Sequence, residues 1–110
     1  MIKIKVRRDG RGNPIGLEIR GHALFAPQGG DIVCAAVSIL AQTVVFALKD
    51  LVRLDFPAKI KEGYLSVSAP AAMEKKKADK FFLLMETMLL GLREIAFSYP
   101  DYVDYTERGG

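Results

Sequence analysis

The sequence predicts an α+β protein with two layers, in which two long helices pack on one face of an antiparallel four-stranded sheet, in the order ββαββα. Three observations lead to this class. Two pairs of short segments alternate apolar with polar residues, as half-buried strands do. Two longer segments repeat apolar residues at spacings of three and four, as amphipathic helices do. Each strand pair precedes one helix, and the 110 residues are expected to form one domain, residues 1–110.

The first strand pair lies at the amino terminus. In residues 2–7 isoleucine and valine alternate with lysine and arginine, and residues 15–19 alternate again. The segment 9–14 between them is rich in glycine, aspartate, asparagine and proline, which favour turns. These residues therefore predict a hairpin. His22 follows its end, where a side chain can face a cleft.

The first helix is expected to begin at Asp31, a residue type preferred as an N-cap, and to run from Ile32 to about Lys49. Gly29 and Gly30 precede it and allow the backbone to turn. One apolar stripe is formed by Val33, Val37, Leu40, Val44 and Leu48. Ile39 and Phe46 add a second apolar face, and such a helix is buried on more than one side. In so short a chain a second copy is the expected cover, so we predict a homodimer.

The second hairpin is predicted over residues 58–61 and 64–68, with Glu62-Gly63 at its turn. The charged run 74–77 opens the second helix, whose buried stripe contains Phe81, Met85, Met88, Leu92 and Ile95. Gly91 is expected to allow a close approach to the first helix. Tyr99-Pro100 ends this helix. The tail to Gly110 is expected to be frayed.

Composition excludes several classes of protein. Half of the residues are apolar and 26% are charged, which does not fit a disordered chain. A single cysteine cannot form an internal disulfide and fits a reducing cytoplasm. The alternating amino terminus does not fit a secretory signal, and no apolar run is expected to be long enough to span a membrane. A net charge of +3 is too small to indicate nucleic-acid binding by itself, so direct binding is not expected.

His22 and Cys34 are the only histidine and the only cysteine, and a glycine-rich segment separates them. A thiol attacks as its thiolate, which a nearby base or a helix N-terminus favours. At a helix start, unpaired backbone N–H groups could also bind the oxyanion formed by attack on a carbonyl. Ser38 lies one turn beyond Cys34, where it could hydrogen-bond the imidazole, a water or the substrate, and Gln42 extends the polar strip by another turn. A polar strip on an otherwise apolar helix indicates a cleft.

Simpler interpretations of the same residues exist. A single cysteine in an apolar helix is usually a small buried hydrophobic residue, and a histidine at a strand end is usually a hydrogen-bonded polar residue. Capping alone would account for Asp31. One histidine and one cysteine fall short of the four ligands of a structural zinc site, so no metal is expected. Redox chemistry lacks a resolving cysteine, and no phosphate-binding glycine motif is present.

The residues around the two candidates resemble a known family. Gly21-His22-Ala23 and the run from Gly29 to Ser38 are similar to the signature of the ribosomal-processing cysteine proteases called Prp. The similarity continues through the Glu62-Gly63 turn, residues 89–92 and residues 98–100. The motif is long and ordered, which makes the resemblance specific.

The resemblance implies a cytoplasmic, homodimeric endopeptidase without a cofactor. It puts the nucleophile at Cys34 and the general base at His22, with supporting roles for Asp31 and Ser38. Enzymes of this family remove a short, apolar amino-terminal extension from large-subunit ribosomal protein twenty-seven, and the cut follows a phenylalanine. A loop between His22 and Cys34 would admit the peptide and close over it, with Gly29 and Gly30 as hinges.

Leu24 and Phe25 in this loop could contact apolar side chains of the substrate, although packing against the fold would explain them equally well. Two other functions are considered. One is a non-catalytic ribosome- or RNA-associated module that uses the basic strand of Lys3, Lys5 and Arg7, and the lack of aromatic residues among these lysines counts against it. The other is a thiol amidase that acts on a small substrate.

Overall fold

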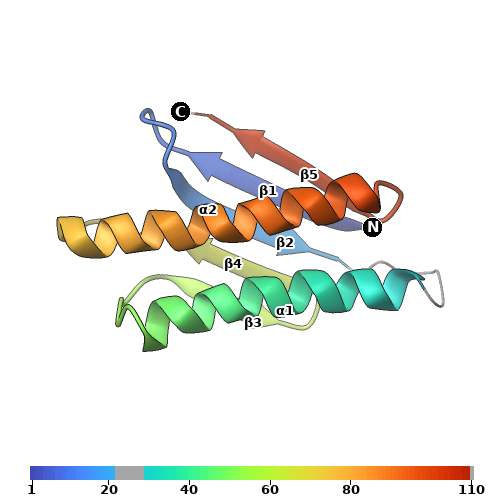
Figure 1. The fold of residues 1–110 in the computed structure, drawn as a ribbon, viewed down its shortest axis with the longest axis horizontal. Helices are drawn as coiled ribbons and strands as arrows, with labels where there is room; N and C mark the ends of the chain where they lie inside the picture. Colours follow the sequence, from blue (N-terminus) through green and yellow to red (C-terminus); the bar gives the residue numbers. More distant parts are fainter. Residues whose placement is uncertain (22–28, 110) are drawn as a thin grey trace.

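The structure, a computed structural model, describes residues 1–21 and 29–109, and for residues 29–31 it describes the backbone only. The chain forms five strands and two helices within these residues. They are β1 (Ile2–Arg8), β2 (Pro14–Arg20), α1 (Gly29–Asp50), β3 (Ala58–Lys61), β4 (Tyr64–Ser68), α2 (Lys75–Ser98) and β5 (Val103–Arg108). Both helices lie side by side on one face of the sheet (Figure 1). The predicted α+β class and the two-layer arrangement are therefore confirmed.

The sheet differs from the prediction in strand number and in direction. Its order is β3-β4-β2-β1-β5, so it has five strands. The pairs β1–β2, β2–β4 and β3–β4 are antiparallel, whereas β5 is parallel to β1. The sheet is mixed, and the prediction of four antiparallel strands was wrong. The tail that was expected to be frayed forms the fifth strand.

Strand β5 is attached at both ends of its pairing with β1. At the start, the backbone N–H of Ile2 donates to the carbonyl of Tyr102 at 2.8 Å, and Val103 is buried. At the other end, Arg8 of β1 contacts Glu107 of β5 at 2.8 Å. The strand was missed because only Val103 and Tyr105 give an alternating apolar signal, while Glu107 faces the same side through a charge.

The core lies between the sheet and the two helices. Strand β1 alternates buried with exposed residues, and its buried side chains meet the apolar faces of α1 and α2. Gly91 of α2 lies against Leu40 of α1, because a Cβ at this position would be 2.6 Å from Leu40 Cδ2. The predicted close approach of the helices at Gly91 is therefore confirmed.

Helix α1 is more apolar than expected. By length and composition alone, the segment Ile32–Asp50 could cross a membrane, with a mean hydropathy of 2.1, contrary to the expectation that no apolar run would be long enough. A core helix meets the same criterion. In α1, Val33, Val45 and Leu48 are fully buried in the core, so we interpret α1 as a core helix that is also apolar on its outer side.

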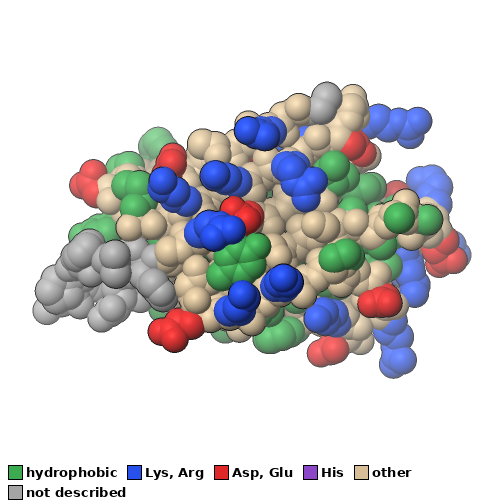
Figure 2. All heavy atoms as spheres, turned by 180° about the vertical axis from the view of Figure 1, so that it is seen from behind, with side chains coloured by type: hydrophobic (Ala, Val, Ile, Leu, Met, Phe, Trp, Pro, Cys, Tyr) green, Lys and Arg blue, Asp and Glu red, His purple; other side chains and the backbone are tan. Residues whose placement is uncertain are grey.

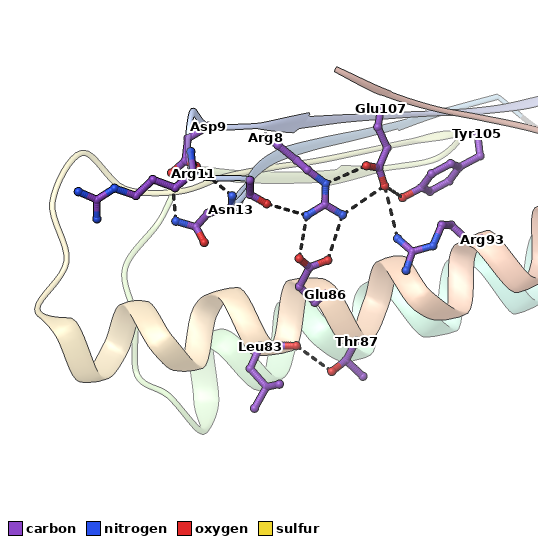
Figure 3. Close-up of polar contacts among 11 residues, drawn as sticks. Arg8, Asp9, Arg11, Asn13, Leu83, Glu86, Thr87, Arg93, Tyr105 and Glu107 are labelled. Atoms are coloured by element: carbon purple, nitrogen blue, oxygen red, sulfur yellow. Dashed lines mark hydrogen bonds and ion pairs between the residues drawn. The ribbon is translucent and has the colours of Figure 1, made fainter. Parts of the chain in front are cut away.

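A cluster of charged groups connects β1, α2 and β5 at the edge of the core (Figure 3). Arg8 donates to both carboxylate oxygens of Glu86, at 2.7 and 3.0 Å, and to Glu107. Tyr105 and Arg93 donate to Glu107 at 2.5 and 3.4 Å. The hydrogen bond from Arg8 is the main cause that lowers the pKa of Glu107 to about 2, and burial raises the pKa of Tyr105 to about 12. The cluster fastens the last strand to the rest of the fold.

Candidate active site

A cavity of about 430 Å³ lies between the first half of α1, the end of β2 and the β3–β4 hairpin. Its volume falls within the range of about 300–1,000 Å³ that is typical of ligand pockets. Helix α1 contributes Cys34, Val37, Ser38, Ala41 and Gln42, and the sheet contributes Ile2, Ile19, Gly21 and residues 60–65. The polar strip on α1 therefore faces a cleft, as predicted.

Cys34 is half-buried, and its side chain packs partly against the hydrophobic core while it lines the cavity. Ser38 and Gln42 follow at intervals of four residues, which places the three side chains along one side of the helix. Gln42 Nε2 donates to Ser38 Oγ at 2.7 Å. This bond holds the serine oxygen in place and leaves its O–H able to donate elsewhere.

The start of α1 differs from the prediction. The helix begins at Gly29, so Asp31 is its third residue and not its N-cap, and Cys34 is its sixth residue and not its third. The first four N–H groups of a helix lack an intrahelical acceptor, and in α1 these all precede Val33. The backbone N–H of Cys34 is therefore not one of them. Asp favours the first helical turn as well as the N-cap, because both are near the positive end of the macrodipole, and this explains the error.

Gly21 fixes the direction in which the chain leaves β2. Its φ of +92° lies in a region that other residues rarely adopt, and its N–H donates to the carbonyl of Gly63 at 2.9 Å. A Cβ at Gly21 would lie 2.5 Å from the carbonyl oxygen of Met1. Gly21 lines the cavity, and His22 is the next residue in the chain.

The predicted site residues have different outcomes. The structure brings Cys34 and Ser38 together on one wall of the cavity. Gly29 and Gly30, predicted as hinges of a loop, form the first residues of α1. His22, Leu24 and Phe25 lie outside the described residues, so their predicted roles stay predictions. Across residues 1–21 and 32–109, no three His, Cys, Asp or Glu side chains gather closely enough to hold a metal ion.

The β3–β4 hairpin was not predicted as part of the site. Ile60, Lys61 and Tyr64 line the cavity opposite α1, and Ile60 is 40% exposed although it is a large apolar residue. In the sequence, the signal for this role is an isoleucine that stands next to the Glu62-Gly63 turn. It is too common on protein surfaces to be read without the fold.

Comparison with known proteins relates this arrangement to one family. Residues 1–104 match the model of the family described as cysteine protease Prp. The chain is 32% identical over 108 residues to the ribosomal processing cysteine protease Prp of Bacillus subtilis, covering 96% of each chain. It is 29% identical over 93 residues to the protein of the same name from Mycoplasma pneumoniae, covering 84% of this chain and 86% of that one.

Solved structures share the fold over the whole chain. The protein SMU.848 from Streptococcus mutans has a TM-score of 0.87 and 32% identity, covering 100% of this chain and 96% of that one. The ribosomal processing protease Prp from S. aureus, solved in complex with a substrate peptide, has a TM-score of 0.84 and 22% identity, covering 98% and 100%. The mixed sheet with two helices on one face is therefore common to these proteins.

Proposed function

Because the chain belongs to the Prp family of cysteine proteases, we propose that it is an endopeptidase in which Cys34 is the nucleophile and His22 the general base. The observation that carries this proposal is the cavity itself. Cys34 lines it on α1, and Gly21, to which His22 is bonded, lines it at the end of β2. A dyad needs a thiol and an imidazole within hydrogen-bond reach of each other at a place that a substrate can enter.

In the proposed reaction, His22 accepts the proton of the Cys34 thiol, and the sulfur attacks the carbonyl carbon of the scissile peptide bond. The carbonyl oxygen becomes an oxyanion. His22 then gives the proton to the leaving amine as the carbon–nitrogen bond breaks, and a thioester remains on Cys34. A water molecule, deprotonated by His22, attacks the thioester carbon; the carbon–sulfur bond breaks, the amino-terminal fragment leaves with a new carboxyl group, and His22 returns the proton to the sulfur. Thiol and imidazole return to their initial states, and no cofactor takes part.

Ser38 has a supporting role in this proposal. Its oxygen accepts from Gln42, which leaves the hydroxyl proton able to donate to the imidazole, a water or the substrate. The negative charge of Asp31, in the first turn of α1, would interact favourably with the backbone N–H groups at the positive end of the helix and with a nearby cation. The proposed oxyanion donors are the unpaired backbone N–H groups of that turn, because the N–H of Cys34 lies beyond it.

The proposed substrate is the apolar amino-terminal extension of large-subunit ribosomal protein twenty-seven, cut after a phenylalanine. The relatives from B. subtilis and M. pneumoniae are named as ribosomal processing proteases, and the similarly folded S. aureus protease binds a substrate peptide. An apolar peptide also suits the apolar part of the cavity wall, where Val37, Ala41 and Ile60 lie. Leu24 and Phe25 are proposed as further apolar contacts. The substrate and the enzyme would meet in the cytoplasm.

Cleavage of a peptide that spans the extension junction tests this function. We expect Cys34→Ala to lower the rate by at least about 10³-fold and His22→Ala by about 10²–10⁴-fold, because each removes a group that exchanges the proton or forms the thioester. Product masses identify the bond that is cut. Thr43→Ala removes another polar side chain from α1 away from the cavity, and it should keep full activity.

Cleavage by the Cys34→Ala protein at the wild-type rate would disprove the nucleophile. Cleavage of small amides but not of the junction peptide would favour the amidase. Thermal unfolding of each variant shows whether a loss of rate comes from the chemistry or from the fold.

We also propose that the protein is a homodimer that associates through the outer surface of its helices. This outer helix surface comprises Ile32, Ile39 and Phe46 of α1 with Leu83, Leu90 and Phe97 of α2. Within each helix the residues recur every seven positions, and all six are between 51 and 84% exposed. A surface patch of large apolar residues is typical of an interface. A second copy of the chain, with the same two stripes, offers a matching cover.

A further inference from the structure

The face of the sheet away from the helices carries seven of the 16 basic side chains of the molecule. Strand register places three rows of side chains across this open sheet face. One row contains Lys61, Tyr64, Arg20, Lys3 and Asp104; the next contains Lys59, Ser66, Glu18, Lys5 and Thr106; the third contains Ser68, Gly16, Arg7 and Arg108. Figure 2 shows Lys and Arg side chains gathered over this side of the molecule.

The charge of the open sheet face exceeds that of the whole chain. Seven basic and two acidic side chains lie on it, giving a net charge of +5, whereas the chain has +3. The rest of the chain therefore has a net charge of −2. Among the ion pairs between described residues, only Arg20–Glu18, at 2.9 Å, involves this face. No other basic side chain of this face forms an ion pair with a described carboxylate, although the charge of Lys5 contributes to lowering the pKa of Glu18.

A hollow of about 520 Å³ lies on this face and is lined by cations and hydroxyl groups. Lys5, Arg7 and Arg108 contribute charge, and Ser66, Ser68 and Thr106 contribute hydroxyls. Arg7 crosses β2 above Gly16, where a Cβ would overlap its guanidinium, and Arg7 Nη2 donates to Ser68 Oγ at 3.4 Å. The missing side chain at Gly16 thus makes room for a guanidinium in the middle of the sheet.

We propose that the open sheet face binds RNA through its phosphate groups. The spacing suits a polyanion, because side chains two residues apart on a strand are about 7 Å apart and neighbouring strands are about 5 Å apart. Several phosphates can therefore be reached at once. Hydroxyls of Ser66, Ser68 and Thr106 add neutral hydrogen bonds between the charged contacts.

Two features of the face favour RNA over other polyanions. The carboxylate of Glu18 lies among the cations and accepts from Arg20 and Tyr64. A carboxylate has about four acceptor sites, so it can accept one more hydrogen bond from a ribose 2′-hydroxyl, a group that DNA lacks. The A-form helix also presents its 2′-hydroxyls in a wide and shallow groove, which a broad sheet face can contact. The guanidinium of Arg20 covers the ring of Tyr64 and lies 4.8 Å from the ring centre, so this ring is not open to a base. We therefore assign recognition to the sugar-phosphate backbone of the RNA and not to base stacking.

The test measures binding of a labelled RNA hairpin, with a stem of about 16 base pairs, to the full chain by fluorescence anisotropy. If about five phosphates are neutralised, the dissociation constant should rise roughly 500-fold between about 50 and about 200 mM salt. The triple variant Lys5→Gln, Arg7→Gln, Arg108→Gln should bind at least about ten times more weakly, with a salt slope lower by about 2 to 3.

The matched control is the triple variant Lys75→Gln, Lys76→Gln, Lys80→Gln, which removes the same charge from the exposed start of α2. It should change the affinity by less than about threefold, since its charges lie on the other layer. The pair Arg7→Lys and Arg108→Lys keeps the charge and should retain binding even if the glutamine variant is unstable. Equal weakening by both triple variants would overturn the proposal.

Two competitors decide the class of partner. A DNA duplex of the same sequence should bind at least about fivefold more weakly than the RNA, because it lacks the 2′-hydroxyl. Equal binding of DNA or of poly-glutamate would overturn RNA as the partner. The Cys34→Ala protein should bind RNA like the wild type, so this proposal and the protease can fail separately.

Discussion

At the scale of single residues, Gly21 has the most restricted position near the cavity. It combines a left-handed backbone conformation with a contact to the Met1 carbonyl that leaves no room for a side chain. The residue therefore determines where β2 ends and where the chain continues toward His22. Its role is to position the site and not to take part in the chemistry.

We predict that Gly21→Ala lowers the free energy of unfolding by about 2–4 kcal/mol, since it adds the cost of a positive φ to that of displacing a backbone carbonyl. Gly12→Ala is the matched control: Gly12 has a similar φ of +85° but nothing within 4 Å of the added Cβ. Its loss should be about 1 kcal/mol. Urea denaturation measures both, and equal losses would show that the Met1 contact has no cost.

The candidate catalytic residues could be singled out from the sequence one at a time. Cys34 and His22 stood out because each is the only residue of its type, and the polar strip through Ser38 indicated the cleft. The helix start was not predictable, because aspartate has the same preference at the N-cap and in the first turn. The role of Ile60 needed the fold, since strand pairing brings it opposite α1.

At the scale of elements, the strands and helices with strong periodicity were predicted closely, including β3 and β4, whereas β5 was not. Strand β5 is stabilised by long-range contacts: parallel pairing with β1 and the charged cluster at Glu107. Such contacts leave little trace in a local pattern, since four of the six residues of the strand are charged or polar. A strand held by non-local pairing is the kind of element that sequence periodicity misses.

The charged cluster makes the stability of the fold depend on pH. Because the folded pKa of Glu107 is lowered to about 2 from an ordinary value of 4.5, its contribution is complete above pH 4.5 and is lost as the pH falls toward 2. At neutral pH the free energy of unfolding of the wild type should exceed that of Glu107→Gln by about 1–2 kcal/mol, after allowance for solvent screening. The difference should shrink between pH 4.5 and 2.

Denaturation midpoints measured across this pH range test the prediction. Glu94→Gln, an exposed change on α2, is the control and should show no such pH-dependent difference. If the denaturation midpoints of wild type and Glu107→Gln differ by the same amount down to pH 2, the stability does not come from the ion pair with Arg8.

At the scale of the whole molecule, the two layers have opposite surface character. The outer helix surface is apolar, and the open sheet face is basic. Because of this segregation, the net charge of +3 understates the local charge of the open sheet face, which is +5. The segregation also explains why α1 has the composition of a membrane helix, since it is apolar on both sides.

We predict that the wild-type protein is a dimer in sedimentation velocity experiments and that Ile39→Glu or Phe46→Glu is a monomer, because a buried carboxylate would lack a partner in an apolar interface. Thr106→Glu adds the same charge to the open sheet face and should stay dimeric. A monomeric wild type at micromolar concentration, or a dimeric Ile39→Glu protein, would refute an interface at the helices.

The placement of both helices on one side of the sheet has a consequence for an assembly of two copies. Subunits joined back to back through their helices would turn both sheets outward, so the pair would be a bivalent particle. Binding of a long polynucleotide would then gain from avidity, with the second contact at high effective concentration. Dilution below the dissociation constant of the dimer would weaken that attachment without altering any residue that touches the polynucleotide.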